Sequence, residues 1–466
     1  MNRKSLIGLL ACLTMCSPLW AEPAGALRVG AARVDSTPAE AAGTGTGKYS
    51  HEKLHIRAIV IDNGQSRAAL IGADMIGLSD KIWTDASKQI AAELQCPVEN
   101  VLMSATHSHS AFVGSMALMG ARDGVPDPAV GFMLEAVRKA KAALRPAQVG
   151  FGTGQAFLNV NRDAIDPKTR LWYQGPNLEA SSDKTVAVLQ FTTRDGKPIA
   201  AYVNYAMHPV SLFLTGIVSA DYPGAMSRYL EQRFDDKAVI VFTQGASGDQ
   251  NPLYMAPTHR AMEVKRAAVM ATGKAKDQND VLALMMSGDP SGNVPLDPKA
   301  ADELEAWVDA EGRVLGEEVL RIMTDTTKFN TSVRIWARQR SLTLPGRTRT
   351  NTGREGMTGT YVDGPDVNLR LGVLAIGDTA LTSVNAELYT DIGQRLKKLS
   401  PMANTVVVTL ANGMANSGYI PTDEAFTHNT FQVLGSRLKP GHAEAAIENG
   451  LSGMIDEYLK SGTVSR

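Results

Sequence analysis

Short apolar runs alternate with amphipathic stretches along most of this chain. The apolar runs are rich in Val, Ile and Ala and have the length of β-strands. We predict strands at residues 58–62, 68–72, 101–104, 185–190, 238–242, 371–376 and 406–410. The amphipathic stretches predict helices at residues 85–94, 128–144, 222–234, 300–323, 388–399 and 443–459. This mixture predicts an α/β fold in which a central β-sheet system is flanked by helices.

Turn-forming residues divide these elements. Asp62-Asn-Gly64 and the segment 194–197 are typical of hairpin turns. Residues 287–298 and 344–367 are rich in Gly, Pro and polar residues, and each is interpreted as either a flap near a pocket or a plain surface loop. Because neither an internal repeat nor a clear linker is visible, we expect residues 22–466 to form one large catalytic domain.

Composition excludes few classes of protein. The 466 residues are 44% hydrophobic and 20% charged, which is ordinary for a globular protein. The formal net charge is -1 and there is no basic run, so nucleic acid is not an expected partner.

The N-terminus resembles an export signal. Asn2-Arg3-Lys4 is basic, the following residues to Leu13 are mostly apolar, and Ala21 precedes a polar start. We predict a signal peptide at residues 1–21 and a periplasmic or secreted protein. The apolar run is too short to span a membrane. A buried N-terminal helix and lipid attachment at Cys12 are the alternatives.

Two histidines stand out among the eight in the chain. His107 and His109 follow an apolar run directly and lie two residues apart. In an extended chain this spacing points both rings to the same side, and two imidazoles that face one space can begin a zinc site. The pattern alone leaves a metal site and ordinary strand-end histidines open.

Three further residues are candidates on weaker grounds. His208 ends another apolar run, where it is either a ligand or a histidine bonded to a carbonyl group. Glu387 follows a strand-like run at the expected start of a helix, where a carboxylate also interacts favourably with the helix N-terminus. Tyr419 lies in a turn-rich loop, and most such tyrosines are packing residues.

Short motifs in a fixed order resemble the neutral/alkaline ceramidases, zinc amidases that cleave N-acyl sphingosine. The resemblance runs from about Val29 to about Gly435. It rests on the segments Val29–Asp35, Leu54–Ala58, Ala73–Met75, Ala105–Ser110, Asn161-Arg162, Asn204–His208, Ser219–Gly224, Asn385–Glu387 and Asn416–Tyr419.

The resemblance implies a zinc site and roles for its neighbours. The implied zinc ligands are His107, His208, Glu387 and Tyr419, which leave a position for water or a substrate carbonyl. His109 is implied to be a pocket residue that bonds the oxyanion or the nucleophile. Arg162 is implied to stabilise the tetrahedral intermediate, and its alternative is a surface ion pair.

One departure concerns the nucleophile. The family has Gly-Asp-Val-Ser-Pro-Asn with a catalytic serine, whereas matching Gly248-Asp249 puts Asn251 at the serine position. An asparagine amide does not serve as the usual oxygen nucleophile. We therefore expect attack by zinc-activated water, with Asn251 as a hydrogen-bond donor. Ser247, which is out of register, is the alternative nucleophile.

The predicted function is an exported zinc-dependent amidase for a small or lipid-like N-acyl amide. Family ceramidases carry a further β-rich domain, whereas this sequence ends at Arg466. The resemblance therefore implies the zinc core more directly than it implies ceramide. The alternatives are a zinc esterase for another carbonyl substrate and a catalytically weak, zinc-bearing periplasmic binding protein. The oligomeric state stays open.

Overall fold

The computed structural model describes residues 25–37, 51–111, 127–287, 291–292, 294–353 and 355–463. The predicted signal peptide and Cys12 lie outside these residues. None of the helices within the described ranges combines the length and the apolar composition that crossing a bilayer requires.

Two five-stranded sheets form the centre of the molecule. Their strand orders are β4-β3-β2-β1-β5 and β11-β10-β9-β6-β13. The first sheet contains β1 (Arg28–Asp35), β2 (His55–Asp62), β3 (Arg67–Ala73), β4 (Val101–Ala105) and β5 (Arg145–Pro146). The second contains β6 (Gln148–Gln155), β9 (Thr185–Thr192), β10 (Pro198–Tyr205), β11 (Val239–Gln244) and β13 (Phe329–Asn330).

Both faces of the first sheet are buried, which explains why its strands appear in the sequence as nearly continuous apolar runs. On β2, Ile59 and Ile61 belong to the core shared with the second sheet. Ala58 and Val60 alternate with them and belong to the core under the helices. Alternate side chains of β2 therefore point to opposite faces of the first sheet, one set towards the second sheet and the other towards the helices.

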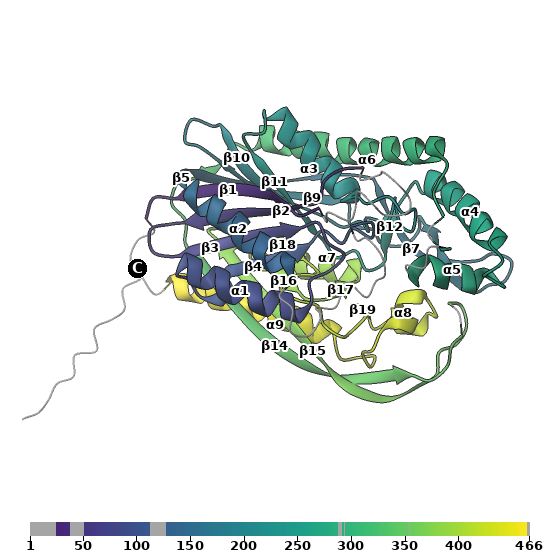
Figure 1. Ribbon diagram of the computed structural model, residues 1–466. Helices are drawn as coiled ribbons and strands as arrows, with labels where there is room; N and C mark the ends of the chain where they lie inside the picture. Colours follow the sequence, from purple (N-terminus) through teal and green to yellow (C-terminus); the bar gives the residue numbers. More distant parts are fainter. Residues whose placement is uncertain are drawn as a thin grey trace, which may run out of the picture.

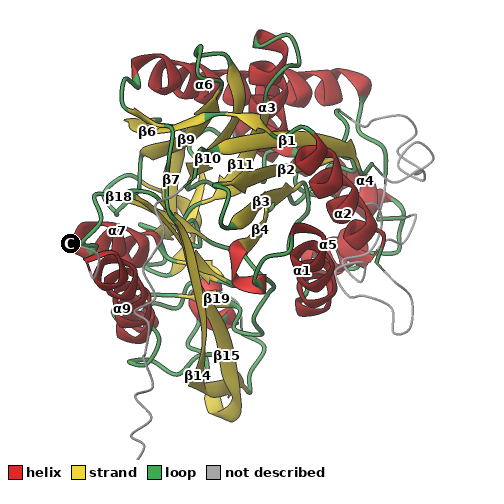
Figure 2. Cartoon of the chain, turned by 90° about the vertical axis from the view of Figure 1, so that its left-hand side faces the viewer, coloured by secondary structure: helices red, strands yellow, loops and turns green. Residues whose placement is uncertain are grey.

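Helices cover the outer face of each sheet, as Figures 1 and 2 show. The first sheet carries α1 (Asp80–Leu94) and α2 (Pro128–Ala142), and the second carries α3 (Asp221–Arg233) and α6 (Pro298–Asp325). Pro128 occupies the first turn of α2, where its missing N–H costs nothing, and Asp127 caps that helix. The layers are thus helix, sheet, sheet, helix, which confirms the predicted α/β class.

A third sheet extends this centre. It has the order β14-β15-β16-β18 and consists of β14 (Ile335–Arg349), β15 (Tyr361–Ile376), β16 (Thr379–Val384) and β18 (Asn404–Val408). One face packs on α7 (Thr390–Leu399) and α9 (Glu444–Thr463). Strands β14 and β15 form a long ribbon that projects from the body (Figure 2).

The ribbon corrects the prediction for residues 344–367. Residues 344–349 and 361–367 belong to β14 and β15, and residues 350–353 and 355–360 lie in the tip that connects these strands. Because one side of the distal ribbon is polar and Gly346 and Gly364 interrupt it, the apolar alternation of a strand is lost in the sequence.

Most of the remaining elements lie around one end of the sheets, whereas the turn η2 precedes β4 at the other end. Two small sheets have the orders β12-β7-β8 and β17-β19. Their strands are β7 (Asn159–Ile165), β8 (Trp172–Asn177), β12 (Gln250–Pro252), β17 (Glu387–Leu388) and β19 (Tyr419–Ile420). The helical elements are α4 (Ala256–Ala271), α5 (Gln278–Ser287), α8 (Phe431–Gly435) and the 3₁₀ turns η2 (Val98–Asn100) and η4 (Ala425–Thr427).

Three parallel strand pairs aim their carboxyl ends at the same region. These pairs are β3 with β4, β10 with β11, and β16 with β18. Loops that leave these ends carry His107, His208 and Glu387, as expected for a site at the ends of parallel strands.

Candidate metal centre

His107 is held in an unusual backbone conformation. It follows β4 by two residues and has a φ of 67°, in the left-handed region that few non-glycine residues adopt. Its backbone N–H donates to the carbonyl of Met75 (2.9 Å), and its Nδ1 donates to the carbonyl of Ile76 (2.6 Å). Because a carbonyl only accepts, the proton lies on Nδ1 and the Nε2 lone pair faces the site.

His208 is oriented by the same type of contact. Its Nδ1 lies 2.8 Å from the Ser247 carbonyl and 3.2 Å from the Gln250 carbonyl. The side chain is buried, and desolvation together with the Arg162 guanidinium lowers the pKa of His208 to about 3. His208 is therefore a neutral imidazole whose Nε2 lone pair is free to bind a cation.

Glu387 and Tyr419 are neighbours across β17 and β19, which pair in parallel with these two residues in register. Glu387 Oε2 lies 3.1 Å from His208 Nε2 and 3.3 Å from His107 Nε2. The Tyr419 ring lies 6.5 Å from the His208 ring, and the guanidinium carbon of Arg162 lies 5.4 Å from the centroid of the Tyr419 ring. Glu387 thus lies in a short strand rather than at the start of the predicted helix.

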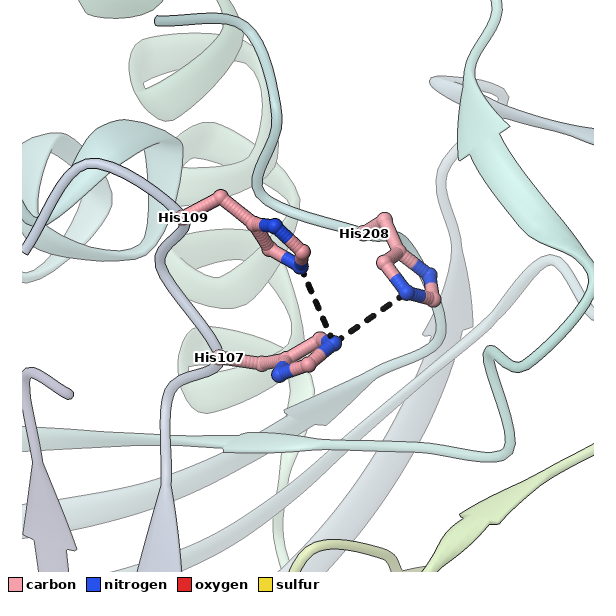
Figure 3. A group of neighbouring side chains, drawn as sticks. All are labelled: His107, His109 and His208. Carbon is pink, nitrogen blue, oxygen red and sulfur yellow. Dashed lines mark hydrogen bonds between the residues drawn. The ribbon is translucent and has the colours of Figure 1, made fainter. Parts of the chain in front are cut away.

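The spacing of these atoms fits a metal ion. His107 Nε2 and His208 Nε2 are 3.1 Å apart, although each offers a lone pair and neither carries the proton that a hydrogen bond needs (Figure 3). Tetrahedral zinc with nitrogen ligands at about 2.0–2.1 Å separates neighbouring ligand atoms by about 3.3 Å. Two imidazole nitrogens and one carboxylate at this separation are a suitable donor set for zinc.

His109 also belongs to the cluster. Its Nε2 lies 3.3 Å from His107 Nε2, and one nitrogen from each of His107, His109 and His208 falls within 4.8 Å of the others (Figure 3). Desolvation by burial lowers the pKa of His109 well below its usual value. Its ring packs edge-on against Phe213 at 5.3 Å. The two histidines meet as predicted, but through a left-handed turn rather than an extended strand.

Arg162 is buried beside the cluster and is not part of a surface ion pair. Its Nη1 donates to Asn251 Oδ1 (3.1 Å) and its Nη2 to the carbonyl of Gly248 (2.5 Å). Its Nε is buried and has no acceptor among the described residues. Ser247 meets the site through its backbone carbonyl, which orients His208.

Two contacts of the site were not predicted from the sequence. The carbonyl of Ile76 orients His107, and a backbone carbonyl leaves no trace in residue type. Asp249 accepts from the backbone N–H of Thr390 (2.9 Å) and from Asn161 Nδ2 (2.9 Å), and so ties β7 to the start of α7. The Gly248-Asp249 pair served only to fix a register, although its buried carboxylate could have pointed to this contact.

Comparison with known proteins gives the family. Residues 39–281 match the family described as neutral/alkaline non-lysosomal ceramidase, N-terminal. Two similar proteins of Dictyostelium discoideum, neutral ceramidase B and neutral ceramidase A, are 26% identical over 230 and 241 residues. Each alignment covers 45% of this chain and 32% of the relative, so the match spans about a third of the length of these relatives.

Two solved structures show the same fold. A ceramidase complexed with C2 has a TM-score of 0.67 at 15% identity and covers 94% of this chain and 76% of its own. The neutral ceramidase of Pseudomonas aeruginosa has a TM-score of 0.67 at 16% identity, with 94% and 75% covered. The structural likeness therefore extends past residue 281 to the part of the chain that carries Glu387 and Tyr419.

Proposed function

The chain belongs to the neutral/alkaline non-lysosomal ceramidase family, and from that membership we propose that it is a zinc-dependent hydrolase that cleaves an N-acyl amide. The observation that supports this most directly is the convergence of His107 Nε2, His208 Nε2 and Glu387 Oε2 at 3.1–3.3 Å. These residues and Tyr419 would hold the metal. When bound, zinc polarises a substrate carbonyl and lowers the pKa of water to roughly 7.

The neighbouring side chains supply the rest of the chemistry. The buried Arg162 guanidinium, with Nε unpartnered among the described residues, stabilises negative charge on the carbonyl oxygen as the tetrahedral intermediate forms. His109 is the pocket residue that bonds the oxyanion or the nucleophile, and its lowered pKa keeps it neutral. Asn251 fixes Arg162 through Oδ1 and retains its N–H groups for the substrate.

Water is the proposed nucleophile. Asn251 offers no nucleophilic oxygen, and Ser247 acts on the site through its carbonyl group.

The predicted export signal at residues 1–21 is retained as part of the proposal, since the basic and apolar pattern that supports it is independent of the fold.

An apolar rim supports a substrate with a hydrocarbon part. Phe431 packs edge-on against Tyr419 with ring centroids 5.8 Å apart and is 48% exposed. Leu171 and Met357 are 46% and 55% exposed. The ribbon tip, which carries Met357, contacts the segments that carry Phe431 and Leu171. The Gly356 N–H donates to the Asn429 carbonyl (2.7 Å), and Gly356 packs against Leu171. We call Leu171, Met357 and Phe431 the apolar rim.

Metal analysis with an amide and ester panel tests the proposal. We expect about one zinc per chain and turnover of N-acyl amides by the unmutated protein. His107→Ala should lose zinc and at least about 100-fold of the activity, whereas Asn251→Ala and Ser247→Ala should retain zinc and measurable turnover. Turnover of esters alone would identify an esterase, and zinc without turnover a binding protein. Complete loss in Ser247→Ala with zinc retained would contradict attack by water.

A further inference from the structure

The turn after β3 holds the key metal-site histidine at two points. Its Met75 carbonyl accepts the backbone N–H of His107, and its Ile76 carbonyl accepts the ring Nδ1. The turn is tight, since the Met75 N–H donates to the Ala73 carbonyl at 2.8 Å. Because His107 has a positive φ, it depends on such contacts to keep its position.

Asp74, at the centre of this turn, is fixed from the sheet side. Its Oδ2 accepts the backbone N–H of His55 (2.8 Å) and Nη1 of Arg57 (3.0 Å). Its own N–H donates to the carbonyl of His55 (3.0 Å). Asp74 is 3% exposed, so water does not replace these partners. The turn therefore cannot shift along β2 without breaking an ion pair and two backbone contacts.

Arg57 connects the turn to helix α3. Its Nε donates to Glu231 Oε1 at 3.1 Å, and that oxygen also accepts the Ile240 N–H of β11 (3.1 Å). Arg57 and Glu231 are 4% and 1% exposed. Burial alone would lower the pKa of Arg57, but the facing Glu231 and Asp74 carboxylates raise it. Well-packed apolar residues often stabilise a fold as much as a buried chain of charges does, so stability alone does not account for these charges. Their distinctive effect is to fix the position of the turn.

We propose that Asp74 and Arg57 are positioning residues for the metal centre, which set the Met75 and Ile76 carbonyls that orient His107. The inference rests on the proposed function only in assuming that His107 binds a metal. Groups that orient a ligating imidazole typically contribute about 10- to 100-fold in metal affinity. Asp74 acts one step farther out, so we expect about tenfold.

The experiment compares two matched carboxylates at opposite ends of the same strand pair. Asp62, at the far end of β2, is 5% exposed, accepts the Gly64 N–H (2.7 Å) and pairs with Arg67 Nε (2.8 Å). Asp74→Ala and Asp62→Ala each remove the partner of one arginine and the acceptor of one backbone N–H group. The readouts are the zinc Kd, from competition with a chromophoric chelator, and the visible spectrum of the cobalt-substituted protein.

We expect Asp74→Ala to raise the zinc Kd about tenfold and to alter the cobalt spectrum, and Asp62→Ala to change the Kd by less than about twofold. Asp74→Asn keeps an oxygen for His55 and should give an intermediate Kd. Should Asp74→Ala fail to fold, Asp74→Asn decides the question. An Asp74 variant with the unmutated Kd and spectrum refutes the positioning role alone, whereas an unmutated protein that binds no zinc refutes the proposed function as well.

Discussion

The two histidines of the segment Ser104–Ser110 differ in how they are held. Both Nε2 atoms reach the cluster, but only His107 has its Nδ1 on a carbonyl group. A ligand needs a fixed tautomer, and a carbonyl partner on the other nitrogen provides it. The His109 ring instead packs edge-on against Phe213, and its Nε2 contacts His107 Nε2.

This difference predicts distinct effects of removing each ring. His109→Ala should retain about one zinc per chain and lower kcat by about 10- to 1,000-fold, because a hydrogen bond to the reacting atoms is lost while the ligands remain. His107→Ala should lose the metal itself. Zinc content and kcat, measured on the same preparations, check both outcomes. Loss of zinc in His109→Ala would make His109 a ligand and would change the proposed set.

The residue types of the site could be predicted, but their arrangement could not. A histidine at the end of an apolar run is visible in the sequence, and the order of motifs assigned His208, Glu387 and Tyr419 by resemblance. The structure brings these residues together through the ends of strands far apart in the chain. The carbonyl groups that fix the imidazoles, and the left-handed turn at His107, depend on tertiary contacts that no local pattern encodes.

At the scale of elements, strands buried on both faces were the easiest to predict. The runs at β2, β3, β9 and β11 lie within one to three residues of the predicted bounds, because burial on both faces leaves a long apolar signal. Helices α4 and α5 went unpredicted. In α4, apolar and charged residues do not separate into clear faces, and its side chains contact other helices and a loop rather than a sheet.

Helix α4 is hydrogen-bonded to the loop of residues 211–215, which packs against His109 through Phe213. Thr258 Oγ1 donates to the Ser211 carbonyl (2.8 Å), and Lys265 Nζ donates to the Thr215 carbonyl (2.9 Å). Phe213, which contacts the His109 ring, lies between these two points. Lys265 is 3% exposed, and desolvation lowers its pKa from 10.5 to about 8. Burying the charged form therefore has a cost that disappears at high pH.

The sign of this effect gives a pH-dependent prediction. Between pH 8 and 10.5 the folded protein binds fewer protons at Lys265 than the unfolded chain does, so this group adds stability as pH rises and loses it as pH falls through 8. Relative to Lys265→Met, the unmutated protein should gain about 2 kcal/mol in free energy of unfolding between pH 7 and 9.5. Denaturant titrations at both pH values measure it. The control is Lys88→Met, at an exposed position. If the free energy of unfolding changed by the same amount between the two pH values in all three proteins, the prediction would be contradicted.

At the scale of the whole molecule, the ribbon connects the third sheet to the rim of the site. Its root is part of the sheet that packs on α9, and its tip contacts the segments around Leu171 and Asn429 (Figure 1). Trp172 stacks on His428 with ring centroids 4.0 Å apart, which fixes the same rim from another direction. The distant ribbon tip thereby becomes part of the wall beside Tyr419, and of the two alternatives predicted for residues 344–367 this agrees with a flap near a pocket rather than with a plain surface loop.

The apolar rim predicts discrimination by acyl length. Met357→Ser should lower kcat/KM for a long-chain N-acyl amide by about 3- to 10-fold, because a partly buried side chain of this size contributes about 1 kcal/mol of apolar contact. The same change should leave kcat/KM for the N-acetyl analogue unaltered, since a short chain does not extend to the rim. Val314→Ser on α6 is the matched control, because Val314 is 54% exposed against 55% for Met357. An equal loss for both substrates would show that the tip supports the metal centre itself, and no loss for either would remove the rim from the binding site.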